Sequence, residues 1–185
     1  IDGGDAGTPG VEIVTGLGVY ALELFEQDMV GVKGYDTAVL EVLARHKVRI
    51  VAKSSNANTI THYLDAPLKA VRRVERDLSE IYPSAALRAR NLGVVSVIGR
   101  DLSGQAVLRR GLDALEEAGV ELIAAQQTTR KVDVQFVVAR DRMTESIGAL
   151  HRKLIEESEE KPAVAEAPAR LAARLCVRQR GEQRA

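Results

Sequence analysis

Residues 40–64 read LEVLARHKVRIVAKSSNANTITHYL, and residues 112–136 read LDALEEAGVELIAAQQTTRKVDVQF. Apolar residues keep one register in both segments, with a constant offset (112 − 40 = 72 and 136 − 64 = 72). The matching pairs are Leu40 and Leu112, Leu43 and Leu115, Val48 and Val120, Ile50 and Leu122, Ile60 and Val132, and Leu64 and Phe136. A register held across one helical and two strand patterns indicates an internal repeat. The chain is therefore predicted to contain two copies of one structural unit.

The apolar periodicity on either side of these segments completes the unit. In the first copy it predicts strands at residues 19–25, 48–54, 59–64 and 85–91, with helices at residues 35–46 and 67–81. In the second copy it predicts strands at residues 93–99, 120–126 and 132–138, with helices at residues 103–115 and 141–154. The order β-α-β-β-α-β is that of a ferredoxin-like sheet with both helices on one face. The predicted fold class is α+β, with two ferredoxin-like βαββαβ units in tandem.

One strand of this pattern is missing and another is left over. The second copy has no fourth strand, while the strand-like residues 11–15 precede the first copy without a partner. Because an open sheet edge favours pairing, residues 11–15 are predicted to complete the second sheet, with the first unit inserted in the second. The expected organisation is a linker or end of a preceding domain at 1–10, the second unit at 11–16 and 92–157, the first unit at 17–91, and a disordered tail or linker at 158–185.

The composition narrows the classes of partner. Lys plus Arg and Asp plus Glu both number 26, so no basic field favours nucleic acid or an anionic membrane surface. No apolar run approaches the ~20 residues that span a bilayer, and no secretory signal opens the chain. One cysteine cannot form an internal disulfide. We therefore expect a cytoplasmic protein without nucleic-acid or membrane partners.

Two motifs suggest catalysis but fail on context. The stretch GLGVYA at residues 16–21 fits a dinucleotide fingerprint, yet it leads into a strand rather than a helix. Ser54, Ser55 and His62 suggest a nucleophile and its base, but strand alternation puts His62 on one face with Ile60 and Leu64. No metal-ligand spacing is present either. The sequence therefore predicts a structural His62, and no catalytic or metal-binding residues in this chain.

A binding site is a better interpretation of the polar loops. The stretch VKGYDT at residues 32–37 leads into a helix, whose first backbone N–H groups can bind a carboxylate. Gly34 allows close approach of a ligand. The strand that ends in Ser54, Ser55 and Asn56 is expected at the same end of the unit. A ligand with both a carboxylate and an ammonium group, such as an amino acid, suits this combination.

At these residues a family resemblance becomes specific. The stretch DMVGVKGYDTAVLEVLARHKVRIVAKSSNANTITHYLD at residues 28–65 resembles the first regulatory ACT domain of aspartate kinases. The stretches VVSVIGRDL and VDVQFVVARDRMTESIGALHRKL, within residues 94–154, resemble the second. The resemblance extends from about residue 11 to about residue 157. It implies an allosteric homodimer that binds lysine or threonine as end product and signals to the kinase domain of the parent chain. ATP and Mg would belong to that kinase domain, so no cofactor is expected in this chain.

The resemblance also implies an effector site and an effector. The implied effector-binding residues are Met29, Lys33, Gly34, Tyr35, Asp36, Ile50, Val51, Ser55, Asn56, Ala57 and Asn58. Many family members carry an acidic residue at the position of Val51. In its overall sequence the chain most resembles bifunctional aspartate kinase/diaminopimelate decarboxylases. This resemblance favours lysine over threonine as the effector. Two alternatives stay open, namely a ligand-free ACT dimerisation module and the amino-acid sensor of another enzyme.

Overall fold

The computed structural model describes residues 10–102 and 106–157, which form one six-stranded antiparallel sheet with four α-helices. The strands are β1 (Gly10–Phe25), β2 (Arg49–Ser55), β3 (Thr59–Asp65), β4 (Ala86–Arg100), β5 (Leu122–Gln127) and β6 (Asp133–Ala139). The helices are α1 (Tyr35–Arg45), α2 (Leu68–Ile81), α3 (Val107–Glu117) and α4 (Met143–His151), with short turns η1 (Gln27–Met29) and η3 (Arg140–Arg142) and a π-helical end η4 (Arg152–Glu156). The predicted linker before residue 10, the predicted helix start at residue 103 and the predicted tail lie outside the described residues.

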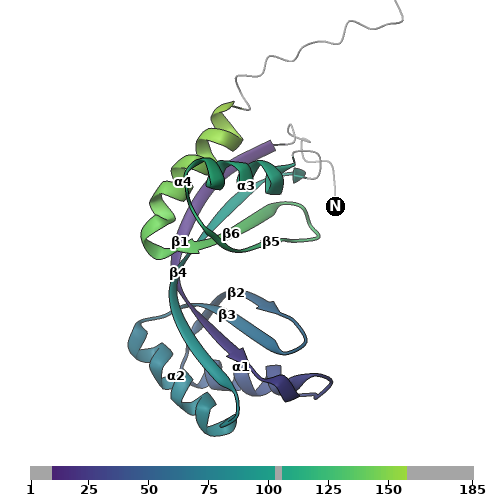
Figure 1. Cartoon of the computed structure of the whole chain (residues 1–185), viewed down its shortest axis with the longest axis vertical. Helices are drawn as coiled ribbons and strands as arrows, with labels where there is room; N and C mark the ends of the chain where they lie inside the picture. The colour runs from purple at the N-terminus through teal and green to yellow at the C-terminus, as the bar shows by residue number, and fades with distance from the viewer. Residues whose placement is uncertain (1–9, 103–105, 158–185) are drawn as a thin grey trace, which may run out of the picture.

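The long strands β1 and β4 form a spine that runs through both halves of the molecule (Figure 1). They pair without a break in the sheet from Gly10 opposite Arg100 to Phe25 opposite Ala86, with one irregularity near residue 12. The expectation of separate strands at 11–15 and 19–25, and at 85–91 and 93–99, was wrong. Gly16, Gly18 and Gly93 do not turn the chain, because none of them has a positive φ.

These glycines instead let helix α4 approach the spine. A Cβ atom on Gly16 would lie 2.7 Å from Ile147 Cδ1, and one on Gly93 would lie 2.8 Å from Met143 Cγ. Contacts this short do not occur between real side chains, so the backbone of β1 and β4 must be bare where α4 crosses them. Gly16 and Gly93 are therefore packing positions in continuous strands.

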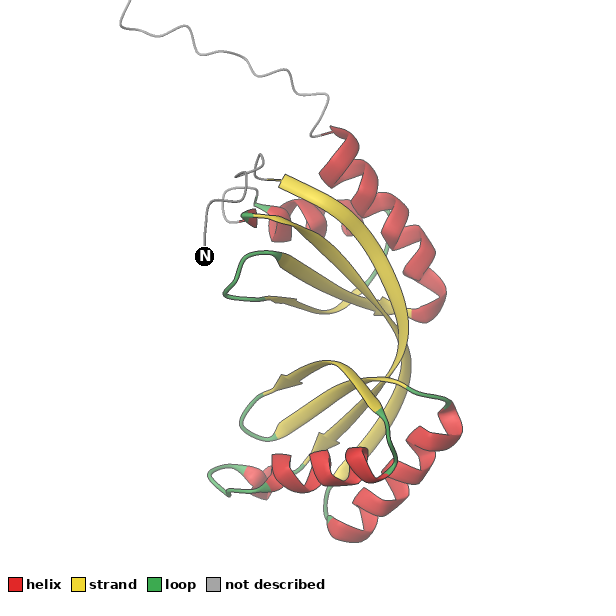
Figure 2. Ribbon diagram, turned by 180° about the vertical axis from the view of Figure 1, so that it is seen from behind, coloured by secondary structure: helices red, strands yellow, loops and turns green. Residues whose placement is uncertain are grey.

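The strand order is β2-β3-β1-β4-β6-β5. In the first half, β2, β3 and parts of β1 and β4 form a four-stranded sheet, and α1 and α2 cover one face of it. In the second half, residues 11–15 pair with β4, where Thr15 lies opposite Ser96, and β4 in turn pairs with β6. Both halves therefore have the ferredoxin-like order predicted from the sequence, with both helices on one face (Figure 2). We call them the first and second units; their residue boundaries stay a prediction.

The repeat is visible in the backbone as well. Helices α1 and α3 begin and end with the same offset (107 − 35 = 72 and 117 − 45 = 72). Each is followed by a residue with positive φ, Lys47 at 54° and Gly119 at 63°. The register of the following hairpin shifts between Ile50 and Ala52 in one unit and between Leu122 and Ala124 in the other. The two units are thus copies down to their irregularities.

Three buried clusters hold the fold together. One lies under α1 and α2, and a second lies under α3 and α4. The third lies on the opposite face of the sheet, near the middle of the spine, and comprises Val19, Ala21, Tyr63, Leu92, Val94 and Val137. We call this the inner face, because the helices lie on the outer sides and the uncovered faces of the two units are turned toward each other (Figure 2).

Candidate functional site

A cavity of about 270 Å³ lies where the loop before α1 meets the turn between β2 and β3. Its lining brings together seven of the eleven residues expected from the sequence, namely Met29, Gly34, Tyr35, Asp36, Ser55, Asn56 and Ala57. Four further residues complete the lining, namely Gly31, Val32, Lys53 and Ile60. The loop and the turn are separated by a helix in the sequence, and the hairpin topology brings them to one end of the first unit.

The other four expected residues lie outside this lining. Val51 packs against the third cluster on the inner face, and Ile50 is exposed at 38%. Asn58 accepts the backbone N–H of Glu26 on its carbonyl at 3.0 Å, which serves the fold rather than a ligand. Lys33 is exposed beside the loop. Because position 51 lies outside the cavity, the absence of an acidic residue there does not alter the charge of the cavity in this chain.

The start of α1 supplies hydrogen-bond donors to the cavity. Gly34 precedes the helix with φ 98°, a conformation that side-chain-bearing residues avoid. The first helical hydrogen bond runs from the N–H of Ala38 to the carbonyl of Gly34, at 3.2 Å. The N–H groups of the preceding helical residues thus have no acceptor within the helix. Tyr35 stacks on Tyr82 with ring centroids 4.6 Å apart, which ties this helix end to α2.

The turn between β2 and β3 is fixed by its own side chain. Asn56 Oδ1 accepts hydrogen bonds from the backbone N–H of Asn58 at 3.1 Å and of Thr59 at 2.9 Å. An Asx turn of this kind holds the backbone without help from the rest of the fold. Asn56 therefore positions Ser55 and Ala57 at the edge of the cavity.

The floor of the cavity carries an ion pair. Lys53 Nζ donates to Asp36 Oδ2, while Asp36 Oδ1 is buried without a hydrogen-bond partner in the described part of the chain. Strand alternation puts Lys53 on the same face as Ser55, so the polar end of β2 contained a signal for it. This lysine was missed because the resemblance pointed to other positions.

His62 is structural, as the alternation predicted. Its side chain is 1% exposed, and its neighbours Ile60 and Leu64 belong to the cluster under α1 and α2. Burial lowers the pKa of His62, the charge of Lys53 lowers it further, and Asp36 opposes the shift. Ser54 lies on the inner face, and Ser55 shares the face of His62, but His62 Nε2 has no hydrogen-bond partner among the described residues, so it forms no pair with either serine.

Within residues 10–102 and 106–157, no group of three or more His, Cys, Asp or Glu side chains is placed to hold a metal ion. No helix in the same ranges is long and apolar enough to cross a membrane.

The comparisons with known proteins agree on one family. The chain is similar to the aspartate kinase Ask_Ect of Stutzerimonas stutzeri (strain A1501), with 39% identity over 160 residues. The match covers 86% of this chain and 34% of the relative, so the chain spans about a third of that relative's length. The regulatory subunit of aspartate kinase from Thermus flavus matches with a TM-score of 0.63 at 16% identity, over 78% of this chain and 98% of that subunit. The chain is therefore similar in sequence to an aspartate kinase, and it has the fold of the regulatory subunit of another.

A further structure has the same fold. E. coli aspartokinase III in complex with lysine and aspartate matches with a TM-score of 0.64 at 18% identity, over 80% of this chain and 34% of that one. No family model matches the chain. The resemblance to ACT domains predicted from the sequence is confirmed, and the cavity described above lies in the first ACT unit.

Proposed function

We propose that this ACT region is the allosteric part of an aspartate kinase, and that the cavity at the start of α1 binds an end-product amino acid. The observation that carries the proposal is the juxtaposition of helix-end N–H groups with the buried, unpartnered Asp36 Oδ1. The first can receive the carboxylate of an amino acid, and the second can receive its ammonium group.

The ion pair between Lys53 and Asp36 supports this placement of the carboxylate and ammonium groups of the ligand. An uncompensated Asp36 at the start of α1 would repel a carboxylate at close range. Because Lys53 neutralises one oxygen of Asp36, the lining combines a cation, the amide donors of the helix end and one buried carboxylate oxygen without a partner in the described part of the chain. A zwitterion complements this arrangement better than an anion or a cation alone.

Lysine is the effector that we propose first. The lining adds apolar surface from Met29, Val32 and Ile60, along which the methylene chain of lysine can lie. The cavity is wider than threonine requires and is open to water at the loop that contains Val32, which is 55% exposed. The structure of aspartokinase III that shares this fold contains lysine, which is consistent with the choice.

We also propose that the chain forms a homodimer through its ACT units. The outer strands of the sheet, β2 and β5, each have one edge that no strand of residues 10–102 and 106–157 pairs with. Exposed edges favour pairing with another chain, and two-fold pairing would cover them. In the parent protein, effector binding at such an interface would act on a kinase that transfers phosphate from ATP to the carboxylate of aspartate.

Thermal unfolding with lysine, threonine and the other standard amino acids tests the proposed site. A ligand that binds only the folded chain stabilises it by about 2.7 kcal/mol at a hundredfold excess over its Kd. We expect lysine to raise the Tm, and Asp36→Asn to abolish that increase. Asp65→Asn is the matched control, because Asp65 pairs with Arg49 at 2.6 Å outside the cavity. If no amino acid raises the Tm, or if both variants respond like the wild type, the proposal is wrong.

A further inference from the structure

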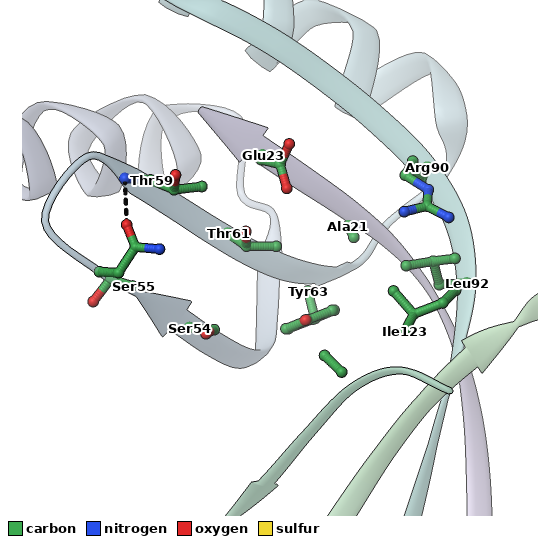
Figure 3. Close-up of a pocket in the computed structure, with 12 residues that line it drawn as sticks. Ala21, Glu23, Ser54, Ser55, Thr59, Thr61, Tyr63, Arg90, Leu92 and Ile123 are labelled. Carbon is green, nitrogen blue, oxygen red and sulfur yellow. Dashed lines mark hydrogen bonds between the residues drawn. The ribbon is translucent and has the colours of Figure 1, made fainter. Parts of the chain in front are cut away.

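A second cavity, of about 240 Å³, lies on the inner face of the sheet (Figure 3). Strands β1, β3 and β4 of the first unit form most of its lining, and Ile123 and Ala124 of β5 close it from the second unit. It shares Ser55 and Asn56 with the cavity at the start of α1, but it lies on the opposite face of the sheet. The two cavities are therefore separate sites.

Two opposite charges face this second cavity without meeting. Arg90 on β4 lies directly opposite Ala21 on β1, and Glu23 is the next residue of β1 on that face. Figure 3 shows the Glu23 and Arg90 side chains on either side of Ala21. Among the described residues, neither side chain forms an ion pair or a hydrogen bond. In the described ranges a half-buried carboxylate and an exposed guanidinium thus face one cavity, and neither has a protein partner.

The pKa of Tyr63 shows that the charges of Glu23 and Arg90 both act on the region of this cavity. Its ring is 5% exposed and belongs to the third cluster, beneath the cavity. Burial raises the pKa of the Tyr63 phenol, the negative charge of Glu23 raises it further, and the positive charge of Arg90 opposes the shift. The phenol therefore lies within the electrostatic range of both groups, in partly desolvated surroundings.

The far end of the cavity is apolar. Ala21 and Leu92 are buried there, and Ile123 and Ala124 face them from β5. Toward the turn between β2 and β3, the lining changes to the hydroxyl groups of Ser54 and Thr61. The cavity therefore offers one cation, one anion, hydroxyl groups and a small apolar end.

We infer that this cavity binds a small zwitterion, specifically an α-amino acid with a short aliphatic side chain. An anion would satisfy Arg90 but would be repelled by Glu23, and a cation would satisfy Glu23 but would be repelled by Arg90. A neutral ligand would leave both charges unpaired. An amino acid places its carboxylate on Arg90 and its ammonium group on Glu23, and its side chain reaches Leu92 and Ile123.

Such a ligand would bridge the two ACT units. Its charged groups would be held by β1 and β4 of the first unit, and its side chain would contact β5 of the second. The inference is independent of the effector site proposed above, because the two cavities use different charged residues.

Methyl NMR of the full chain with L-valine as the probe tests the inference. We expect L-valine to shift the Ile123 methyl signals saturably. The two halves of the probe, isobutylamine and 3-methylbutanoate, each lack one charge and should leave those signals in place at the same concentration. This comparison uses the wild-type chain, so it does not depend on the folding of any variant.

Variants then assign the charges. Glu23→Gln and Arg90→Gln should each raise the Kd for L-valine about tenfold or more, because each loses a charge-assisted contact. Arg109→Gln is the control, because Arg109 is exposed on α3 and does not line the cavity. Its Kd should match that of the wild type.

Three results would overturn the inference: no shift of Ile123 with L-valine, an equal shift with either single-charge probe, or an unchanged Kd in both charge variants. The Met29 methyl signal reports on the other cavity. A shift of Met29 with lysine, while Ile123 stays silent with L-valine, would preserve the proposed function and overturn this inference. A shift of Ile123 with L-valine, while Met29 stays silent with lysine, would preserve this inference and overturn the proposed function.

Discussion

Lys53 of β2 lies directly opposite His62 of β3, and both side chains are on the helix-covered face of the first unit. His62 Nε2 is buried without a hydrogen-bond partner in the described part of the chain. A buried imidazole beside an ammonium group is stable only in its neutral form, because desolvation and repulsion both penalise the second proton. The folded state is therefore sensitive to acid at this position.

This relationship predicts a loss of stability in mild acid. The pKa of His62 in the folded chain is lowered from 6.5, so the unfolded chain binds more protons as the pH falls below that value. The free energy of unfolding should therefore decrease as the pH falls from 7 toward the folded pKa. In the second unit, the position equivalent to His62 is Val134 (134 − 62 = 72), which is fully buried. His62→Val should remove this part of the pH dependence.

Urea unfolding of the two proteins between pH 5 and pH 8 checks the prediction. Carboxylates titrate in both proteins, so the difference between their unfolding free energies isolates His62. That difference should move in favour of the variant as the pH falls. A difference that does not change with pH would contradict the assignment.

A buried carboxylate in the first unit predicts a second effect. Glu26 is 6% exposed, and Ser84 Oγ donates a hydrogen bond to Glu26 Oε2 at 2.7 Å. Hydrogen bonds to charged groups contribute about 1.5–3 kcal/mol, and Ser84→Ala leaves the carboxylate buried without this donor. We expect a loss of that size in the free energy of unfolding. Ser79→Ala is the control, because Ser79 bonds a helix carbonyl at an exposed site and should change little.

A charge cluster between α1 and α2 predicts behaviour at lower pH. His46 Nε2 lies 2.7 Å from Asp77 Oδ2, and Arg76 Nη2 lies 3.1 Å from Asp77 Oδ1. The hydrogen bond from His46, and then that from Arg76, lower the pKa of Asp77 from 3.8. Its contribution is therefore present above about pH 3.8 and is lost as the pH falls through the lowered value.

Asp77→Asn should remove this contribution. The variant should be less stable than the wild type at pH 7, and the two should converge at the acid end of a thermal unfolding series. Asp65→Asn removes an ion pair that is more exposed and should change the curve less. Parallel curves for Asp77→Asn and the wild type down to the acid limit would argue against the cluster.

The sequence predicted the units, their order and the insertion, because all three follow from periodicity and from a repeat that tertiary packing cannot disguise. It divided β1 and β4 into separate strands, because glycine is suited both to the end of a strand and to a strand that a helix approaches closely. Of the expected site, most of the loop and turn residues came together, because the topology puts both segments at one end of the first unit, but Lys33 and Asn58 do not line the cavity. The inner-face charges were missed: Glu23 and Arg90 follow simple alternation, but their shared cavity also depends on β5, which packs there only in the folded chain.

The repeat also makes a packing prediction. Gly111 of α3 lies over the ring of Phe136, and a Cβ atom at Gly111 would lie 2.3 Å from Phe136 Cζ. The equivalent positions in the first unit are Val39 (111 − 39 = 72) and Leu64 (136 − 64 = 72), and both are buried in the cluster under α1 and α2. The two units thus fill the same space with a larger helix residue in one and a larger strand residue in the other.

Gly111→Ala should therefore destabilise the chain, by about 1–3 kcal/mol, although alanine is the better helix former. Gly148→Ala is the matched control in α4: a Cβ atom there meets nothing within 4 Å, so alanine should stabilise by about 0.4–1 kcal/mol. Adding Phe136→Leu to Gly111→Ala recreates the division of volume found in the first unit. The double variant should lose less stability than the sum of the two single variants, by about 0.5–3 kcal/mol, as measured by urea unfolding. Strict additivity would mean that the helix and the ring do not share this space.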